Sequence, residues 1–242
     1  MARNVFDLLK GKVVHAMKPT CTILTLALCL SNCHNHAQMV NGNSADKKPA
    51  MDSMAFQKLN KLFVVGDFDG DGIRDTVFQH TVSLRTGKEI VHTPDPFQHE
   101  WDNMVKWFDD QEAEVYLTMN IQNPDTLHLG FAQGLYGLIN VGDNNADGRD
   151  EIALVIDHLD FSAVNSCKIF SLCKGQWTLL KQFGVLEDAF VLTDEQVPVF
   201  DQIEGFLENR NGKWMYRDYL PKGGADQKGD ENMTLLILDK CH

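Results

Sequence analysis

Two acidic segments carry the residue types best suited to chemistry, VVGDFDGDGIRDTVF (64–78) and NVGDNNADGRDEIAL (140–154). Each has oxygen-bearing side chains at positions 1, 3, 5 and 9 of a short loop, with glycine at position 6. Alternate positions of a tight loop can turn their oxygens toward one centre, and Ca²⁺ takes about six to eight oxygen ligands. The pattern therefore predicts two calcium sites. The predicted ligands are the side chains of Asp67, Asp69, Asp71 and Asp75 with the carbonyl of Ile73, and those of Asp143, Asn145, Asp147 and Glu151 with the carbonyl of Arg149.

Three alternatives compete with this interpretation of the loops. Magnesium is less suited because it prefers a small octahedral shell that keeps several waters. An EF-hand needs a bidentate Glu at position 12, where this sequence has Phe78 and Leu154. Ordinary Asp-Gly turns would explain one loop, but two loops that match at five positions favour metal binding. The first loop is expected to bind more tightly, because Asn145 removes one charge from the second.

The residues that flank each loop indicate a strand, a loop and a second strand. LFVV precedes and TVF follows the first loop, while LINV and IALVI flank the second. With an acid at position 9, this arrangement resembles the FG-GAP calcium loops of integrin α propellers and of bacterial VCBS-like repeat proteins. The resemblance implies structural Ca²⁺ that pins the turn between two strands of a repeated β unit. The sequence departs from that pattern at Ala146, where glycine is usual.

Most other elements that must position these loops are predicted to be strands. Residues 167–183 and 205–220 each indicate a β-hairpin, with turns at Lys174–Gln176 and Asn209–Gly212. A final apolar strand is predicted at Met233–Leu238.

Short helices are expected at two places. An amphipathic turn or helix is predicted at Ala55–Leu62, and helical spacing of apolar residues predicts another in FQHEWDNMVKWFDD (97–110). The fold class is therefore predicted to be mainly β, as an antiparallel β-meander or incomplete propeller-like repeats with strand–loop–strand calcium loops and one or two short helices. The apolar face of the second helix is predicted to consist of Phe97, Trp101, Met104, Val105 and Phe108.

The N-terminal region reads as a targeting segment. The apolar run 21–30 follows Lys18 and is too short to span a bilayer, so residues 1–33 are predicted to form a signal region. Met17 suggests that residues 1–16 are an over-extended start. Leu30-Ser31-Asn32-Cys33 is similar to a lipobox, which would make Cys33 the lipidated residue; the alternative is cleavage after Ala37. Residues 34–53 are expected to be a flexible tether to a calcium-binding β domain, 54–242.

Charge restricts the class of partner. The net charge of −12 repels phosphate backbones, so no nucleic acid is expected to bind. Membrane contact is expected only through a lipid anchor. The chain is predicted to be exported, as an outer-membrane or periplasmic lipoprotein or alternatively as a soluble secreted protein, with an unknown protein or glycan as partner.

Three cysteines fall within the predicted β domain. Cys167 and Cys173 lie in one predicted strand, where an extended chain holds them too far apart to bridge each other. Either all three are free thiols, or Cys241 pairs with one of the other two.

No motif in the sequence identifies a catalytic site: the nucleophile elbow, P-loop, dinucleotide fingerprint and zinc-protease helix are absent. The leading hypothesis is a structural, binding or adhesive module at the bacterial envelope. A second is a secreted glycan-active hydrolase or its accessory carbohydrate-binding domain, and a third is an inhibitor that pairs through an edge strand. The second would use tryptophans as sugar platforms, namely Trp101, Trp107, Trp177 or Trp214.

Overall fold

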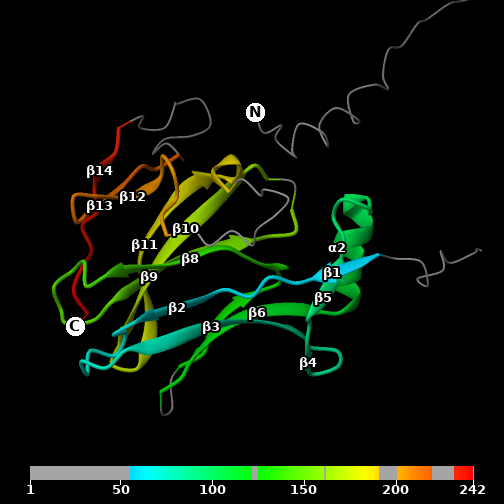
Figure 1. Ribbon diagram of the computed structural model, residues 1–242, viewed down its shortest axis with the longest axis horizontal. Coiled ribbons are helices and arrows are strands. Elements are labelled where there is room, and N and C mark those ends of the chain that lie inside the picture. The colour runs from blue at the N-terminus through cyan, green and yellow to red at the C-terminus, as the bar shows by residue number, and fades with distance from the viewer. Residues whose placement is uncertain (1–54, 122–124, 161, 191–200, 220–231, 242) are drawn as a thin grey trace, which may run out of the picture. The chain divides into compact units, whose positions relative to one another are not determined.

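Figure 1 shows the computed structural model of the protein, in which every described residue belongs to the compact unit Met54–His242. The predicted signal region, Cys33 and the tether lie outside the described residues. Those residues are 55–121, 125–160, 162–190, 201–219 and 232–241. The elements are β1 (Phe56–Lys58), β2 (Phe63–Gly66), β3 (Asp75–Ser83), β4 (Lys88–Glu89), β5 (His92–Pro94), α2 (Trp101–Asp110), β6 (Ala113–Met119), β7 (Leu127–Gly130), β8 (Gly134–Gly142), β9 (Glu151–Asp157), β10 (Val164–Cys173), β11 (Gln176–Leu186), the 3₁₀ turn η2 (Glu187–Ala189), β12 (Leu207–Arg210), β13 (Lys213–Tyr216) and β14 (Thr234–Leu235).

Antiparallel sheets dominate, which confirms the predicted mainly β class. The first sheet has the order β2-β3-β6-β7, with β4 paired to β3, and the second has the order β11-β10-β9-β8. Strands β12, β13 and β14 form a third sheet, and β1 pairs with β5. Most neighbours are consecutive along the chain, so the connectivity is that of a meander. The described strands do not show a propeller.

Strand β9 lies at the centre of the packing, because all seven of its residues are buried. Ile152, Leu154 and Ile156 enter a core cluster shared with the first sheet, while Ala153 and Val155 enter a cluster shared with the third. Side chains of a strand alternate between its two faces, so an uninterrupted apolar run fits a sheet that is covered on both sides. This sheet therefore sets the position of the second acidic loop, which leads directly into β9.

Helix α2 confirms the predicted second helix but changes its buried face. Met104, Trp107 and Phe108 are buried, whereas Phe97 is 59% exposed. Phe97 precedes the N-cap, Glu100, and so it cannot follow the helical spacing that suggested it. Among the described residues, no helix combines the length and apolarity needed to cross a membrane.

The predicted helix at Ala55–Leu62 is wrong. Residues 56–58 form β1, which pairs antiparallel with β5 through Phe56 and Pro94, Gln57 and Thr93, and Lys58 and His92. Backbone pairing to a distant segment overrides the weak local preference of so short a stretch.

Both predicted hairpins are present. Lys174 and Gly175 connect β10 to β11, and Asn211 and Gly212 connect β12 to β13, with positive φ at all four residues. Two central residues of positive φ match the right-handed twist of the strands. The predicted last strand is shorter than expected, since only Thr234–Leu235 pairs, with β13.

The three cysteines among the described residues divide into one pair and one free thiol. Cys173 and Cys241 form a disulfide whose Cα atoms lie 5.3 Å apart, so the interpretation that all three are free is wrong. Cys167 is a buried free thiol, and burial raises its pKa because a thiolate would be poorly solvated there.

Asp157 is a buried carboxylate at the end of β9, away from the acidic loops. Its main chain and side chain both accept hydrogen bonds from Gln133, and Tyr136 and Glu187 lie beside it. Burial raises the pKa of Asp157 to about 7. Hydrogen bonds from Gln133 and Tyr136 lower this pKa, whereas the charges of Glu187 and Asp160 raise it.

We therefore expect Asp157 to make stability depend on pH. The pKa is higher in the folded state, so the contribution of Asp157 is fully present below the unfolded pKa of about 4 and is lost as the pH rises to about 7. Asp157→Asn should remove this decline, so that the difference in unfolding free energy between variant and wild type changes steadily from pH 4 to pH 7.5. Urea titrations without added metal measure it, with exposed Asp201→Asn as control. A constant difference across that range would contradict the assignment.

Candidate metal centres

Both acidic loops connect antiparallel strands in the same register. Gly66 pairs with Asp75 where the first loop closes, and Gly142 pairs with Glu151 where the second closes. The residue before position 1 thus lies opposite the acid at position 9 in each hairpin. This confirms the predicted strand–loop–strand arrangement, and Figure 1 shows both loops at the same end of their sheets.

The carboxylate at position 1 organises each loop through the glycine at position 6. Asp67 Oδ2 accepts a hydrogen bond from the N–H of Gly72 at 3.0 Å, and Asp143 Oδ2 accepts one from Gly148 at the same distance. Both glycines have positive φ, 84° and 92°, a conformation that is strained for other residues. The chain therefore wraps around the first carboxylate in the same way in both loops.

A second hydrogen bond, from the N–H at position 5 to the side chain at position 3, is also the same in both loops. The N–H of Asp71 donates to Asp69 Oδ1 at 3.1 Å, and the N–H of Asp147 donates to Asn145 Oδ1 at 2.9 Å. These bonds hold the position 3 side chains inward, so two sequences that differ at six of their nine loop positions fold into one local geometry.

Each loop brings three carboxylates together. One oxygen of each lies within 4.8 Å of an oxygen of the other two, which places both groups close enough to hold a metal ion. The first group consists of Asp67, Asp69 and Asp71, and the second of Asp143, Asp147 and Glu151. Six of the predicted side-chain ligands are thus gathered, while Asp75 lies outside its group and Asn145 lies beside Asp147 in the second loop.

Position 9 explains why the groups differ. Asp75 and Glu151 are both buried, and they accept the N–H of Phe68 and Asn144 at 3.2 and 2.9 Å respectively. The side chain of Glu151 is one methylene longer, so it can make this bond and still reach the other two acids of its loop. The shorter Asp75 lies outside the group of its loop; burial, followed by the charge of Asp69, raises its pKa, and the N–H groups of Phe68 and Asp69 oppose this.

Glu151 is the least satisfied carboxylate of the two loops. It is 0% exposed, and its Oε1 atom has no hydrogen-bond partner of normal geometry among the described residues. Burial raises the pKa of Glu151 to about 7, and the charges of Asp147 and Asp143 also raise it. The hydrogen bond from the Asn144 N–H lowers the pKa, and the Ser171 hydroxyl lowers it weakly. A cation in this loop would supply both the missing partner and the missing counter-charge.

The two predicted carbonyl donors, Ile73 and Arg149, remain predictions. Their N–H groups donate to Asp71 and Asp147 at 2.7 and 3.2 Å, which fixes the peptide at position 7 next to each carboxylate. The Arg149 guanidinium also lies 3.7 Å from Asp147 Oδ1, at the edge of the second group.

The loops also contact each other, which the sequence did not reveal. Asp150 Oδ2 accepts hydrogen bonds from the N–H of Asp67 at 3.1 Å and from Asn140 Nδ2 at 2.8 Å, and the Asp150 N–H donates to the Asp67 carbonyl at 2.8 Å. Asn140 Nδ2 also donates to the Val65 carbonyl, which links β8 to β2. Position 8 is Arg74 in the first loop, so no shared pattern singled out Asp150.

The tryptophans do not assemble into one platform. Trp107 and Trp214 are buried, and the four belong to three separate core clusters. Trp101 and Trp107 lie on α2 and share one cluster, Trp177 packs against the cluster of the first sheet, and Trp214 lies in that of the third. This distribution counts against the hypothesis of a sugar-binding surface built from these side chains.

Comparison with protein-family models, with curated proteins and with solved structures finds no match to this chain. The residues of the loops themselves therefore carry the functional interpretation.

Position 4 gives a direct test of the loop geometry. Gly70 has φ 81°, and Ala146 holds the same left-handed region at φ 56°. We expect Ala146→Gly to raise the free energy of unfolding by about 0.5–1 kcal/mol, because glycine adopts this region without strain. Gly70→Ala should do the opposite, since its Cβ would meet the Gly148 carbonyl and Arg149 at 3.0 Å. Chemical denaturation of both variants measures this; destabilisation by Ala146→Gly would contradict the assigned backbone.

Proposed function

We propose that this protein is an exported calcium-binding β module with two structural calcium loops, of the type that FG-GAP and VCBS-like loops represent. In this proposal its role at the bacterial envelope is structural, binding or adhesive, toward a protein or glycan partner, and Cys33 carries the lipid anchor. The observation that supports the proposal most strongly is the shared geometry of the two loops, each of which gathers three carboxylates. The buried Glu151 of the second loop adds to it, because among the described residues only the Ser171 hydroxyl acts on its Oε1 atom, and weakly.

The donor set favours calcium over other ions. All gathered side chains offer oxygen, and the described acidic groups contain neither His nor Cys, which zinc and copper would prefer. Several carboxylates in a loop of main-chain donors suit the large, flexible shell of Ca²⁺, whereas Mg²⁺ would keep more waters.

The position of the loops favours a structural role for the ion. Each loop closes a hairpin, and the contact of Asp150 with Asp67 joins the two hairpins at that end. Neutralising the carboxylates would therefore stabilise the junction between the first and second sheets.

Removal of calcium should destabilise the protein. A ligand that binds only the folded state stabilises it by about 2.7 kcal/mol at a hundredfold excess over Kd, or roughly 5–10 °C in Tm per site for a chain of this size. We expect the Tm measured in calcium to exceed the Tm measured in EGTA by this amount for each occupied site. Asp71→Asn should remove the first-site part, and Asp147→Asn the second-site part.

Asp109→Asn serves as the matched control, because Asp109 is an exposed acid of α2 outside both loops. It should keep the full calcium-dependent shift. Native mass spectrometry should count two calcium ions on the wild type and one on each loop variant. A wild-type melt that is unaffected by chelation, or single variants that both retain two ions, would exclude the proposed sites.

Glu151→Gln should change stability in opposite directions with and without calcium. Without metal, the amide removes a buried charge, keeps an acceptor for Asn144 and offers a donor toward Ser171, so the free energy of unfolding should rise by about 1–3 kcal/mol. With calcium, the second-site stabilisation should be lost. The exposed Glu204→Gln is the control, and an unchanged calcium increment in Glu151→Gln would rule out Glu151 as a ligand.

A further inference from the structure

The second acidic loop is covered by a segment from the far end of the described chain, residues 236–241. Four consecutive loop residues each form one hydrogen bond to this segment. The pairs are Asn144 Nδ2 to the Leu236 carbonyl at 3.1 Å, Asn145 Nδ2 to the Asp239 carbonyl at 3.1 Å, Lys240 Nζ to the Ala146 carbonyl at 2.6 Å, and the Cys241 N–H to Asp147 Oδ2 at 3.1 Å. We call residues 236–241 the strap.

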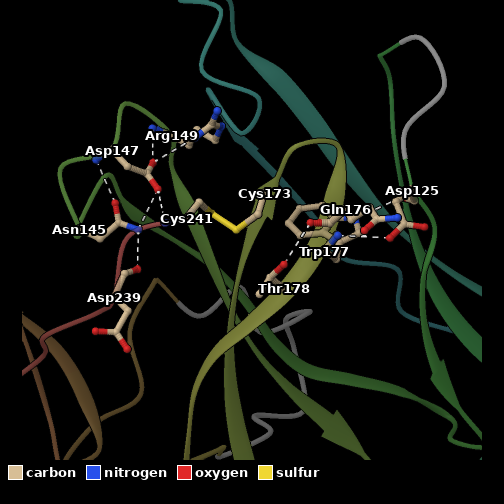
Figure 2. The surroundings of a disulfide bond; sticks show 10 residues. All are labelled: Asp125, Asn145, Asp147, Arg149, Cys173, Gln176, Trp177, Thr178, Asp239 and Cys241. Carbon is tan, nitrogen blue, oxygen red and sulfur yellow. Dashed lines mark hydrogen bonds and ion pairs between the residues drawn. A yellow bond between two sulfur atoms is a disulfide. The ribbon is translucent and has the colours of Figure 1, made fainter.

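The strap acts on side chains that belong to the proposed second metal site. Asn145 Nδ2 donates to the strap and to Asp147 Oδ2, which leaves Oδ1 as the end of the amide that can serve a cation. The Cys241 N–H fixes Asp147 through its Oδ2 atom. Figure 2 shows both side chains turned toward the strap beside the disulfide.

The disulfide fixes one end of the strap, and buried leucines fix the other. Leu236 and Leu238 lie in the core cluster of the third sheet, but Asp239 and Lys240 are exposed. Residues 239–241 are thus held by their hydrogen bonds to the loop and by the bond from Cys241 to Cys173. Without that bond, three exposed or partly exposed hydrogen bonds would have to order the segment alone, and each contributes only about 1 kcal/mol.

Cys173 lies in a hairpin whose strands are held by hydrogen bonds. It ends β10 and pairs across the hairpin turn with Gln176, the first residue of β11. The residue after Gln176 is Trp177, whose N–H and Nε1–H donate to Asp125 at 3.2 and 3.1 Å (Figure 2). When the disulfide is broken, the Cys241 side is therefore the side expected to move.

The first loop has no such cover among the described residues. The hydrogen bonds of its Asp69 and Asp71 side chains stay within the loop, and Asp71 is exposed where Asp147 is partly buried. The two loops share one geometry but differ in this attachment, so the first loop is an internal control for any effect of the strap.

From these contacts, and on the basis of the proposed calcium function, we infer that the Cys173–Cys241 disulfide controls the affinity of the second metal site by holding the strap on Asn145 and Asp147. A dithiol reductant would transfer two electrons and two protons, breaking the Sγ–Sγ bond to give two thiols while the dithiol becomes a disulfide. Reduction then frees residues 239–241, loosens both ligand side chains and lowers calcium affinity at the second site alone.

Isothermal titration of the full chain with calcium tests this, using variants that leave one site each. In Asp71→Asn, which retains the second site, reduction with dithiothreitol should weaken calcium binding about ten- to a hundredfold, a usual range for coupled sites. In Asp147→Asn, which retains the first site, reduction should change nothing. Cys173→Ser/Cys241→Ser combined with Asp71→Asn should bind weakly in either condition, which controls for effects of the reductant on other cysteines.

A second measurement does not depend on variants that fold. Coupling is reciprocal, so calcium must make the disulfide of the wild type harder to reduce by the same factor. For a two-electron couple, a tenfold factor corresponds to about 30 mV. Titration in dithiol redox buffers, with and without saturating calcium, should show a shift of at least this size toward negative potential.

The outcomes separate the two proposals. If oxidised Asp71→Asn binds calcium, reduction leaves that binding unchanged and calcium does not shift the disulfide potential, the inference is overturned. The proposed calcium sites are not affected by that result. Equal weakening in both single-site variants also overturns it, because a general loosening of the fold would then be the cause. Absence of calcium binding in every oxidised form overturns the proposed function and the inference with it.

Discussion

Closely spaced carboxylates repel one another, and at one end of the two meander sheets this repulsion occurs twice, with three acids gathered in each loop. Main-chain N–H groups at positions 5, 6 and 7 donate hydrogen bonds to these acids in both loops and so stabilise their charges in part. Hydrogen bonds do not remove net charge, however. The buried, partly unpartnered Glu151 is where the shortfall is greatest, and a cation is the simplest way to offset it.

The packing of the core explains why Glu151 is the carboxylate that lacks a counter-charge. Strand β9 begins at Glu151 and is buried along its whole length between two apolar clusters, so the carboxylate at its start cannot turn out into water without displacing the strand. Asp75 begins β3 in the same register but is one methylene shorter, and main-chain N–H groups of its own loop, at Phe68 and Asp69, bond to it. The rigid part of the fold thus dictates which acid of each loop is left in need of a partner.

Attachment to the rest of the molecule distinguishes two loops that are otherwise alike. Asp150 and Asn140 fasten the second loop to the first hairpin. The strap fastens it to the core cluster of the third sheet and, through the disulfide to Cys173, to β10 of the second sheet. The first loop has internal bonds and the contact from Asp150. In the proposed arrangement, the second site is therefore connected, through the strap, to the covalent state of two cysteines that lie far from it in the sequence.

The sequence by itself determined the parts that depend on neighbours along the chain. The positions of Asp67 and Asp143, the glycines at position 6, the two later hairpins and α2 follow from local turn and helix geometry, and all are present. Only the tertiary structure decided that Ala55–Leu62 holds a strand, that Phe97 is exposed, that Cys241 pairs with Cys173, and that Asp150 and the strap reach the loops. Those features require contacts between segments far apart in sequence, and such contacts are fixed by packing, which local spacing does not encode.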